Sequence, residues 1–353
     1  MPRDEGFADI AVKLRERDRS EQVSEGRCNI VPLPPVATRP FRSELTVEQN
    51  TIFVSNQYRG DAYTFEHQIS HPDSGEPVIR RITVGRENAT DRGRGVLTQI
   101  HQDVFYAVLR LWAEGTPHYQ FIGGATGESY GKIHETRYKV VTAIRGAGND
   151  RAEDYRRVQQ LLRDLASTPV TLENVYTWQG FKERETFTLL SEVRWRERAS
   201  AAGDEEARVV ILLSSFVTEG FLHKNIKILL GQPYDELRSE EAPAAPGQRR
   251  RGSQLEIARL LYPFLDSQLA KKDEYSARLD GLCERFGLGK YVYKSERKRK
   301  FDRSLQALDG KLIQKGEYVL RITLRESKDG DDFVMCARRE RAGNDQQLGL
   351  FDQ

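Results

Sequence analysis

The chain has 353 residues, of which 38% are hydrophobic and 31% are charged, and its formal net charge is +2. This length predicts two or three domains, and this composition is typical of a globular protein with a large polar surface. No run of about 18 apolar residues occurs, which excludes a membrane-spanning helix. The N-terminal residues lack the apolar core of a signal peptide, and the three cysteines (Cys28, Cys283 and Cys336) are too widely spaced for a disulfide framework or a zinc cluster. We therefore expect a protein of the reducing cytoplasm.

The N-terminal part of the chain predicts an arm and then short strands. Residues 1–45 are rich in charge and include the Pro-rich stretch VPLPPVATRP, so we expect a charged, partly flexible arm. Residues 46–95 alternate apolar and polar side chains, as in TIFVSNQY and VIRRITVG, which is typical of strands. From Val96 the apolar residues recur at helical spacing as far as Gly115, which predicts a helix.

The middle of the chain predicts a strand, two helices and a β-hairpin after that first helix. A short strand, HYQFI, and a Gly-rich loop lead to helices expected over 135–145 and 151–166. Strand-like runs follow as VYTWQG, TFTLLSEVRW and ARVVILLSSFV. A linker rich in Pro, Ala, Glu and Arg then ends this part of the chain.

A similar order of elements recurs after the linker. Helices are expected over 254–270, 274–286 and 295–309, followed by strands in EYVLRITL and DDFVMCA that are joined by the polar turn RESKDG. Pro263 lies inside the first of these helices and is expected to kink or break it. We expect an α+β fold with an arm, a strand-rich lead-in plus a first domain, a linker, a second domain and a flexible tail, over 1–45, 46–238, 239–252, 253–340 and 341–353.

The helices expected over 151–166 and 295–309 share one pattern at a constant offset of 143 residues. Each has an apolar trio at i, i+4 and i+7, and this spacing places the trio on one buried stripe: Val158, Leu162 and Leu165 in the first helix, Phe301, Leu305 and Leu308 in the second. Each also has a polar trio that points away from the stripe: Arg156, Gln160 and Arg163 in the first, Arg299, Arg303 and Gln306 in the second. Arg and Gln can both form bidentate hydrogen bonds to base edges in the major groove. The alternative interpretation of either face is a solvated helix surface.

The second helix also begins in a basic stretch, KYVYKSERKRKFDR, over residues 290–303. Seven basic and two acidic side chains give it a net charge of +5. Such a stretch attracts phosphates and makes binding dependent on salt, and Ser295 can cap the helix. The DNA-contacting residues predicted here are Lys294, Arg297, Lys298, Arg299, Lys300, Arg303 and Gln306.

Six segments carry a family resemblance by their pattern and order: LTQIHQDVFYAVLRLW, DYRRVQQLLRDLASTPVTLEN, SSFVTEGFLHKN, ARLLYPFLDSQL, YSARLDGLCERFGL and SERKRKFDRSLQALDGK. Over residues 96–340 the chain resembles the tandem winged-helix initiators of iteron-type plasmid replication, especially the TrfA-like group. The resemblance implies two tandem winged-helix domains, and the strand-rich N-terminal region before residue 95, predicted from alternation alone, lies outside it. The resemblance also implies that both domains bind directly repeated origin DNA, melt a nearby A·T-rich region and recruit the host replication machinery.

The C-terminal tail has a second resemblance. Its pentapeptide QLGLF is similar to the peptide by which bacterial proteins dock on the replicative sliding clamp, usually written Gln-Leu-(Ser/Asp)-Leu-Phe. The resemblance implies that Leu350 and Phe351 enter an apolar pocket while Gln347 hydrogen-bonds nearby, with Leu348 beside it. Gly349 departs from the usual third residue and should lower the affinity by adding flexibility. The alternative is that the tail folds back onto the chain's own core.

No catalytic or metal-binding pattern stands out. His67 and His71 are interpreted as turn residues rather than a metal pair, because Gln68 stands where a zinc protease would have glutamate. The stretch GGATGESYGKI departs from a nucleotide-phosphate loop, because it has three residues rather than four before its Gly-Lys pair and has Ile133 where Ser or Thr would coordinate magnesium. The sequence therefore predicts a protein that is not an enzyme and has no cofactor or metal.

These observations together predict a plasmid-type replication initiator in the cytoplasm, whose partners are double-stranded DNA with direct repeats and the bacterial sliding clamp. The replicative helicase or its loader, and a second copy of the chain, are partners left open. A winged-helix transcriptional repressor without origin activity is the alternative. A third interpretation, a scaffold that does not bind DNA, is disfavoured by the basic stretch.

Overall fold

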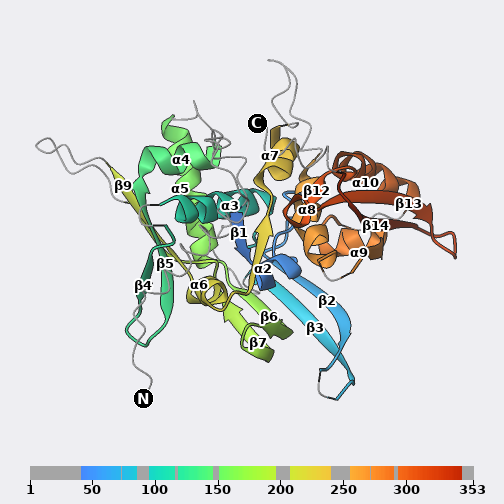
Figure 1. The fold of residues 1–353 in the computed structure, drawn as a ribbon, viewed down its shortest axis with the longest axis horizontal. Helices are drawn as coiled ribbons and strands as arrows, with labels where there is room; N and C mark the ends of the chain where they lie inside the picture. Colours follow the sequence, from blue (N-terminus) through green and yellow to red (C-terminus); the bar gives the residue numbers. More distant parts are fainter. Residues whose placement is uncertain are drawn as a thin grey trace, which may run out of the picture. The chain divides into compact units, whose positions relative to one another are not determined.

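The computed structural model describes residues 41–72, 74–85, 95–115, 118–145, 151–195, 207–239, 255–270, 272–289 and 293–343 (Figure 1). The fold is α+β, as the sequence predicts. By its internal contacts the chain divides into two units. Within the described part, the first unit comprises residues 103–167 and 187–225, and the second comprises residues 41–102, 168–186 and 226–343. The five segments predicted in chain order remain a prediction.

The first unit contains one four-stranded sheet with helices before, between and after its strands. Its sheet has the order β4-β5-β9-β8. Trp112 of α3 is central to its core: 1% of the residue is exposed, and its ring meets those of Phe121 and Phe221 edge-on, at centroid distances of 5.2 and 4.9 Å. The elements of this unit, the first few residues of α3 excepted, are α3 (Gln99–Glu114), β4 (Phe121–Gly123), β5 (Ser129–Thr136), α4 (Arg137–Arg145), α5 (Ala152–Ser167), β8 (Leu190–Trp195), β9 (Arg208–Leu213) and α6 (Ser215–Leu222).

The second unit contains two four-stranded sheets and a short strand pair. One sheet, with the order β2-β3-β6-β7, is built from β2 (Ala62–Ser70), β3 (Pro77–Gly85), β6 (Val170–Thr177) and β7 (Gly180–Phe187), of which Phe187 belongs to the first unit. The strand pair, β1 (Phe41–Glu44) with β10 (Ile226–Leu229), is accompanied by α2 (Leu45–Gln49) and α7 (Gly231–Ser239).

The other sheet of the second unit belongs to the C-terminal part of the chain and has the order β11-β14-β13-β12. Helix α10 packs against α8, α9 and β13. A buried ion pair between Lys227 and Asp266, with 3.1 Å between Nζ and Oδ2, joins β10 to α8. The elements are α8 (Glu256–Gln268), β11 (Glu274–Arg278), α9 (Leu279–Arg285), α10 (Lys294–Leu308), β12 (Leu312–Ile313), the 3-10 turn η2 (Gln314–Gly316), β13 (Tyr318–Glu326) and β14 (Phe333–Arg341).

The internal repeat predicted from two helices extends to the topology of the sheets. With β4, β6, β7 and β12 set aside, module one (α3, β5, α4, α5, β8 and β9) and module two (α8, β11, α9, α10, β13 and β14) have the same order: helix, strand, helix, helix, strand, strand. In each module the last strand lies in the middle, as β5-β9-β8 and as β11-β14-β13. The third helix of each module, α5 or α10, is the one with the repeated polar trio.

The strands after α5 correct the prediction that the β-hairpin of the first domain follows α5 directly. The hairpin that follows α5 directly, β6–β7, is not part of the sheet of module one, because β6 pairs with β3. The hairpin of that sheet is β8–β9, and the residues joining its strands, 196–206, lie outside the described residues. The run TFTLLSEVRW, predicted as one strand, contains the end of β7 and all of β8. Sequence alternation identified these strands and did not identify their partners.

Three smaller predictions also differ from the structure. The helix predicted over 274–286 is the strand β11 followed by the shorter helix α9. Helix α8 is not broken at Pro263, because it is buried along its length, and packing on several sides outweighs the lost hydrogen bond. His67 lies within β2 rather than in a turn. Within the described ranges, no helix is long and apolar enough to cross a membrane.

Candidate nucleic-acid interface

Helix α5 separates its apolar and polar faces as its periodicity predicts. Val158, Leu162 and Leu165 are each 0% exposed, and α5 packs against β8 and α4. The three residues of the predicted polar trio, Arg156, Gln160 and Arg163, are all exposed. The stripe therefore holds the helix to the module while the trio faces solvent.

The polar face of α5 has hydrogen-bond donors available for a ligand. Gln160 donates to Asp164 Oδ1 at 2.8 Å, a contact within one helical turn on the surface. Arg156 and Arg163 make no hydrogen bond or ion pair with any residue that the structure describes. A guanidinium fork without a protein partner can bind a base edge or a phosphate with two parallel hydrogen bonds.

Helix α10 repeats this arrangement in module two. Phe301 and Leu308 are 0% exposed and Leu305 is 5% exposed, whereas the polar trio of Arg299, Arg303 and Gln306 is exposed. Gln306 donates to Asp302 Oδ2 at 3.2 Å, again within one turn. As on α5, the two arginines of the trio have no partner among the described residues.

Part of the basic stretch at the start of α10 is used inside the module. Arg297 is only 8% exposed, and its Nε donates to Asp332 Oδ1 at 2.7 Å. Lys294 donates to Glu326 and to the carbonyl oxygen of Gly330. Arg297 therefore differs from the predicted pattern, because it faces the protein and fastens α10 to the β13–β14 hairpin.

Two lysines of the same stretch lie nearer the surface. Lys298 is exposed, and its Nζ lies 5.1 Å from the centre of the Phe333 ring. Lys300 is half-buried and donates to Gln57 Oε1 at 2.9 Å, across to the loop after residue 54. Both contacts engage neutral groups, so both lysines keep their positive charge available to a phosphate.

The turn of the β13–β14 hairpin is acidic, and its charge is opposite to that of a phosphate-binding wing. Residues 326–332 hold four acidic side chains and one lysine. Arg278 neutralises part of this charge, with 2.9 Å from Nη1 to Asp329 Oδ2 and 2.9 Å from Nη2 to Asp331 Oδ2. A turn with this charge is not suited to binding phosphates.

In module one, Arg137 connects three elements beside the trio of α5. Its guanidinium lies 5.3 Å from the centre of the Tyr155 ring of α5 and 5.2 Å from that of Trp195 of β8. A cation between two aromatic rings contributes about 0.5–1 kcal/mol per contact at exposed sites. No sequence pattern points to Arg137, because it and its two ring partners lie far apart in the chain.

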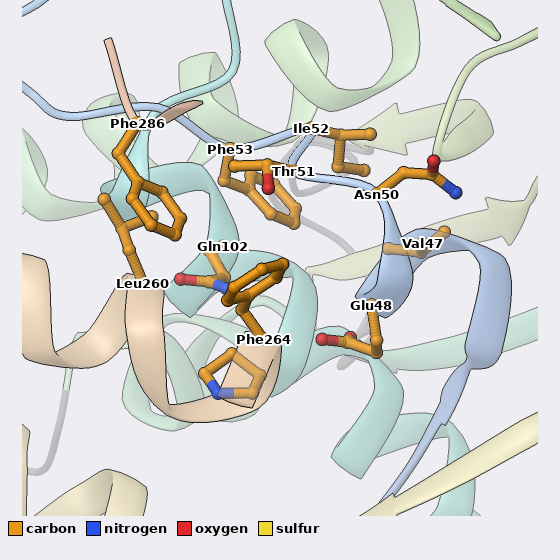
Figure 2. A pocket seen from close by; sticks show the side chains of 11 residues that line it. Val47, Glu48, Asn50, Thr51, Ile52, Phe53, Gln102, Leu260, Phe264 and Phe286 are labelled. Atoms are coloured by element: carbon orange, nitrogen blue, oxygen red, sulfur yellow. The ribbon is translucent and has the colours of Figure 1, made fainter. Parts of the chain in front are cut away.

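Other features that could form a site do not do so. The Gly-rich stretch GGATGESYGKI forms the β4–β5 hairpin, with Gly127 at a φ of +94°, instead of leading from a strand into a helix. A cavity of about 20 Å³ in the second unit, lined by Thr51, Gln102 and Phe264 among others (Figure 2), has room for about one water molecule. The described residues contain no group of three or more His, Cys, Asp or Glu that could hold a metal ion.

The predicted clamp-binding residues, Gln347, Leu348, Leu350 and Phe351, lie outside the described residues, which end at 343. The same holds for Cys28 and for nearly all of the predicted linker. Their roles stay predictions from the sequence.

No protein-family model matches the chain, and no curated protein matches it. Two solved structures of domains 2 and 3 of RctB are similar to it. The first, a selenomethionine derivative, has a TM-score of 0.47 and 10% sequence identity, and the match covers 85% of this chain and 99% of that chain. The second has a TM-score of 0.45 and 13% identity, and the match covers 86% of this chain and 99% of that chain. The likeness is coarse, and the case for a nucleic-acid interface rests on the geometry of α5 and α10.

Proposed function

We propose that this chain is a sequence-specific DNA-binding replication initiator with two tandem winged-helix domains, module one and module two. The observation that carries the DNA-binding part is the repeated polar face. In two modules of the same sheet topology, the third helix exposes two arginines without protein partners among the described residues and one glutamine. The third helix of a winged helix-turn-helix is the element that enters the major groove.

The chemistry of the trios suits base recognition. Arg binds the O6 and N7 atoms of guanine with two hydrogen bonds, and Gln binds N6 and N7 of adenine, each pair discriminating by about 1–3 kcal/mol. The hydrogen bonds of Gln160 to Asp164 and of Gln306 to Asp302 are both on the surface. Replacing these two hydrogen bonds by hydrogen bonds to bases therefore costs little free energy.

In module two, fewer residues remain to contact phosphates than the sequence predicts. Lys298 and Lys300 are the cations beside the trio of α10 that keep only neutral partners. Arg297 and Lys294 support the helix instead, through Asp332 and Glu326. DNA binding should therefore be salt-dependent through a small set of cations, since each neutralised phosphate releases counterions.

The role in replication is supported by the sequence. The resemblance to iteron-type initiators supports binding to directly repeated origin DNA, origin opening and recruitment of host replication proteins. The tail residues Gln347, Leu348, Leu350 and Phe351 support recruitment of the sliding clamp. We propose no catalytic activity and no cofactor for this chain.

Origin activity is tested by plasmid maintenance. A plasmid that carries the repeats but no initiator should be maintained only when this gene is supplied in trans. Binding of the repeats without maintenance of the plasmid would favour the alternative, a transcriptional repressor built from the same domains. Failure to bind any repeat would contradict the initiator.

A further inference from the structure

Two arginines and one histidine meet on one face of the β2–β3 hairpin in the second unit. His67 and Arg80 are directly opposite each other in the antiparallel register, where facing side chains have Cβ atoms about 4.5–5.5 Å apart. Phe65, two residues before His67, lies on the same face, and its ring centre is 5.5 Å from that of His67. Arg285, at the end of α9, lies with its guanidinium carbon 4.3 Å from the centre of the Phe65 ring.

The protein partners of this cluster (His67, Arg80 and Arg285) are all neutral. Arg80 donates to Asn50 Oδ1 at 2.5 Å, and Arg285 donates to Thr51 Oγ1 at 3.2 Å. Asn50 and Thr51 are adjacent residues that line the small cavity of Figure 2. No carboxylate in the part of the chain that the structure describes pairs with either arginine.

The cluster also contains polar atoms that the protein leaves unsatisfied. Arg80 Nε and His67 Nδ1 are buried and have no hydrogen-bond partner among the described residues. Burial, and then the positive charges of Arg285 and Arg80, lower the pKa of His67 to about 4. Burial, and then Arg285, lower the pKa of Arg80 to about 10. Both shifts share the same two causes, burial first and then the positive charge of Arg285.

Arg81, the next residue on the same strand, is an arginine whose charge is balanced by carboxylates of the protein. Arg81 points to the other face of the sheet, with 2.5 Å from Nε to Glu66 Oε1 and 3.0 Å from Nη1 to Glu173 Oε2. Arg80 has no such partner among the described residues. A partly buried cation is costly unless it is paired, so a negative group from outside the described chain would stabilise the cluster.

We propose that His67, Arg80 and Arg285 form a binding site for a tetrahedral phosphate-type oxyanion. Two guanidinium groups suit several oxygens around one phosphorus, whereas a single carboxylate is already satisfied by one guanidinium fork. All three side chains are half-buried, so an anion can approach them from solvent. The adjacent cavity of about 20 Å³ has room for about one water, so the anion binds at the solvent side of the cluster, where it balances the charge of the two guanidinium groups without reaching the buried Arg80 Nε and His67 Nδ1.

The phosphate has two possible sources, a DNA backbone or a free small phosphate. The first source rests on the proposed function, and the second does not. Both present the same oxygens to the cluster, and separate measurements distinguish them.

The site is tested by thermal unfolding of the full chain in sodium phosphate and in sodium chloride at equal ionic strength. Phosphate should raise the Tm of the wild type by about 2–4 °C at a concentration well above the dissociation constant. Arg80→Gln should reduce this increment to the general stabilising effect that phosphate has on any folded protein, and the matched control Arg81→Gln, on the other face of the strand, should retain it in full. An equal Tm in the two salts, or an increment as large in Arg80→Gln as in the wild type, would overturn the proposal.

A second variant keeps the test decisive if Arg80→Gln does not fold. Arg285→Met retains an apolar stem against Phe65 and Phe264, whose ring centres lie 4.3 and 4.8 Å from the guanidinium carbon. It removes the charge and should reduce the phosphate increment in the same way. Retention of the full increment in folded Arg285→Met would likewise overturn the proposal.

Fluorescence anisotropy with repeat DNA identifies the source of the phosphate. Weaker DNA binding by Arg80→Gln, together with the reduced phosphate increment, assigns the site to the DNA backbone. Unchanged DNA binding with a reduced increment assigns it to a free phosphate. If the wild type binds no repeat DNA while its phosphate increment persists, the proposed function fails and the oxyanion site stands.

Discussion

Arg297 and Asp332 form a buried ion pair that fastens the start of α10 to the residue before β14, with 2.7 Å between Nε and Oδ1. The side chain of Asp332 is 0% exposed, and its second oxygen accepts a hydrogen bond from the backbone amide of Asp280 at 2.9 Å. One carboxylate therefore joins the candidate recognition helix, the hairpin after it and the first turn of α9. Together with the buried stripe of α10, this pair holds the helix that carries the polar trio.

Asp332→Asn should lower the free energy of unfolding by about 3–5 kcal/mol, because it leaves the buried guanidinium of Arg297 without a counter-charge. Urea unfolding followed by circular dichroism measures the change. Asp329→Asn is the matched control, because Asp329 is in the same turn with 56% of its side chain exposed, and it should unfold close to the wild type. Equal stability of Asp332→Asn and wild type would contradict the role given to the pair.

The same pair predicts a dependence on pH. Burial alone would raise the pKa of Asp332, but hydrogen bonds from the Asp280 amide and the Arg297 guanidinium outweigh it and lower the pKa below its ordinary 3.8. A carboxyl whose folded-state pKa is lowered contributes stability above its unfolded pKa and loses it as the pH falls through the folded value. The stability difference between wild type and Asp332→Asn should therefore be full at about pH 6 and shrink below about pH 4. A difference that stays constant from pH 6 to pH 3 would contradict this linkage.

Changes to the polar trio of α10 should alter both the affinity for repeat DNA and the salt dependence of its binding. Changing Arg299 and Arg303 together to Ala should weaken binding of repeat DNA by about 1–3 kcal/mol for each arginine that reads a base. For each arginine that contacts a phosphate instead, the slope of log K against log salt should fall by about 0.9. Anisotropy titrations at several salt concentrations measure both quantities. Arg81→Ala, whose arginine is paired with Glu66 and Glu173 on a strand, should change neither; unchanged binding by the double variant would remove α10 from the interface.

Changes in the C-terminal tail should remove binding to the sliding clamp only. Leu350→Ala with Phe351→Ala should abolish capture of the sliding clamp and leave binding of the repeats intact, because these two side chains are the apolar anchors of the peptide. A pull-down with purified clamp, alongside a DNA titration of the same variant, measures both. If clamp capture survives, the tail is not the docking peptide.

The amphipathic helices are predictable because their signal is local. The sequence predicts α5 over 151–166 and the structure has it at Ala152–Ser167; it predicts α10 over 295–309 and the structure has it at Lys294–Leu308. The apolar stripes determine both results, since a period of three to four residues can bury only one face of a helix. The outward direction of the polar trios follows from the same period.

Strand partners and buried charges are not predictable from local pattern. Alternation in VIRRITVG predicts β3, yet it does not show that β3 pairs with β6, about ninety residues later. Nor does it show that Arg81 meets two carboxylates while Arg80, its neighbour, donates to the neutral Asn50. Arg297 lies in a basic run, and only the fold brings Asp332 to it. In each case the deciding partner is far away in the sequence, and nothing local identifies it.

The central claim is that α5 and α10 read repeated DNA, and footprinting on the DNA that flanks the gene tests it most directly. At physiological salt the wild type should protect direct repeats. Changing Arg156 and Arg163 to Ala should remove protection from one part of each repeat, and changing Arg299 and Arg303 should remove it from another part. Absence of any protected repeat with the wild-type protein would contradict the account.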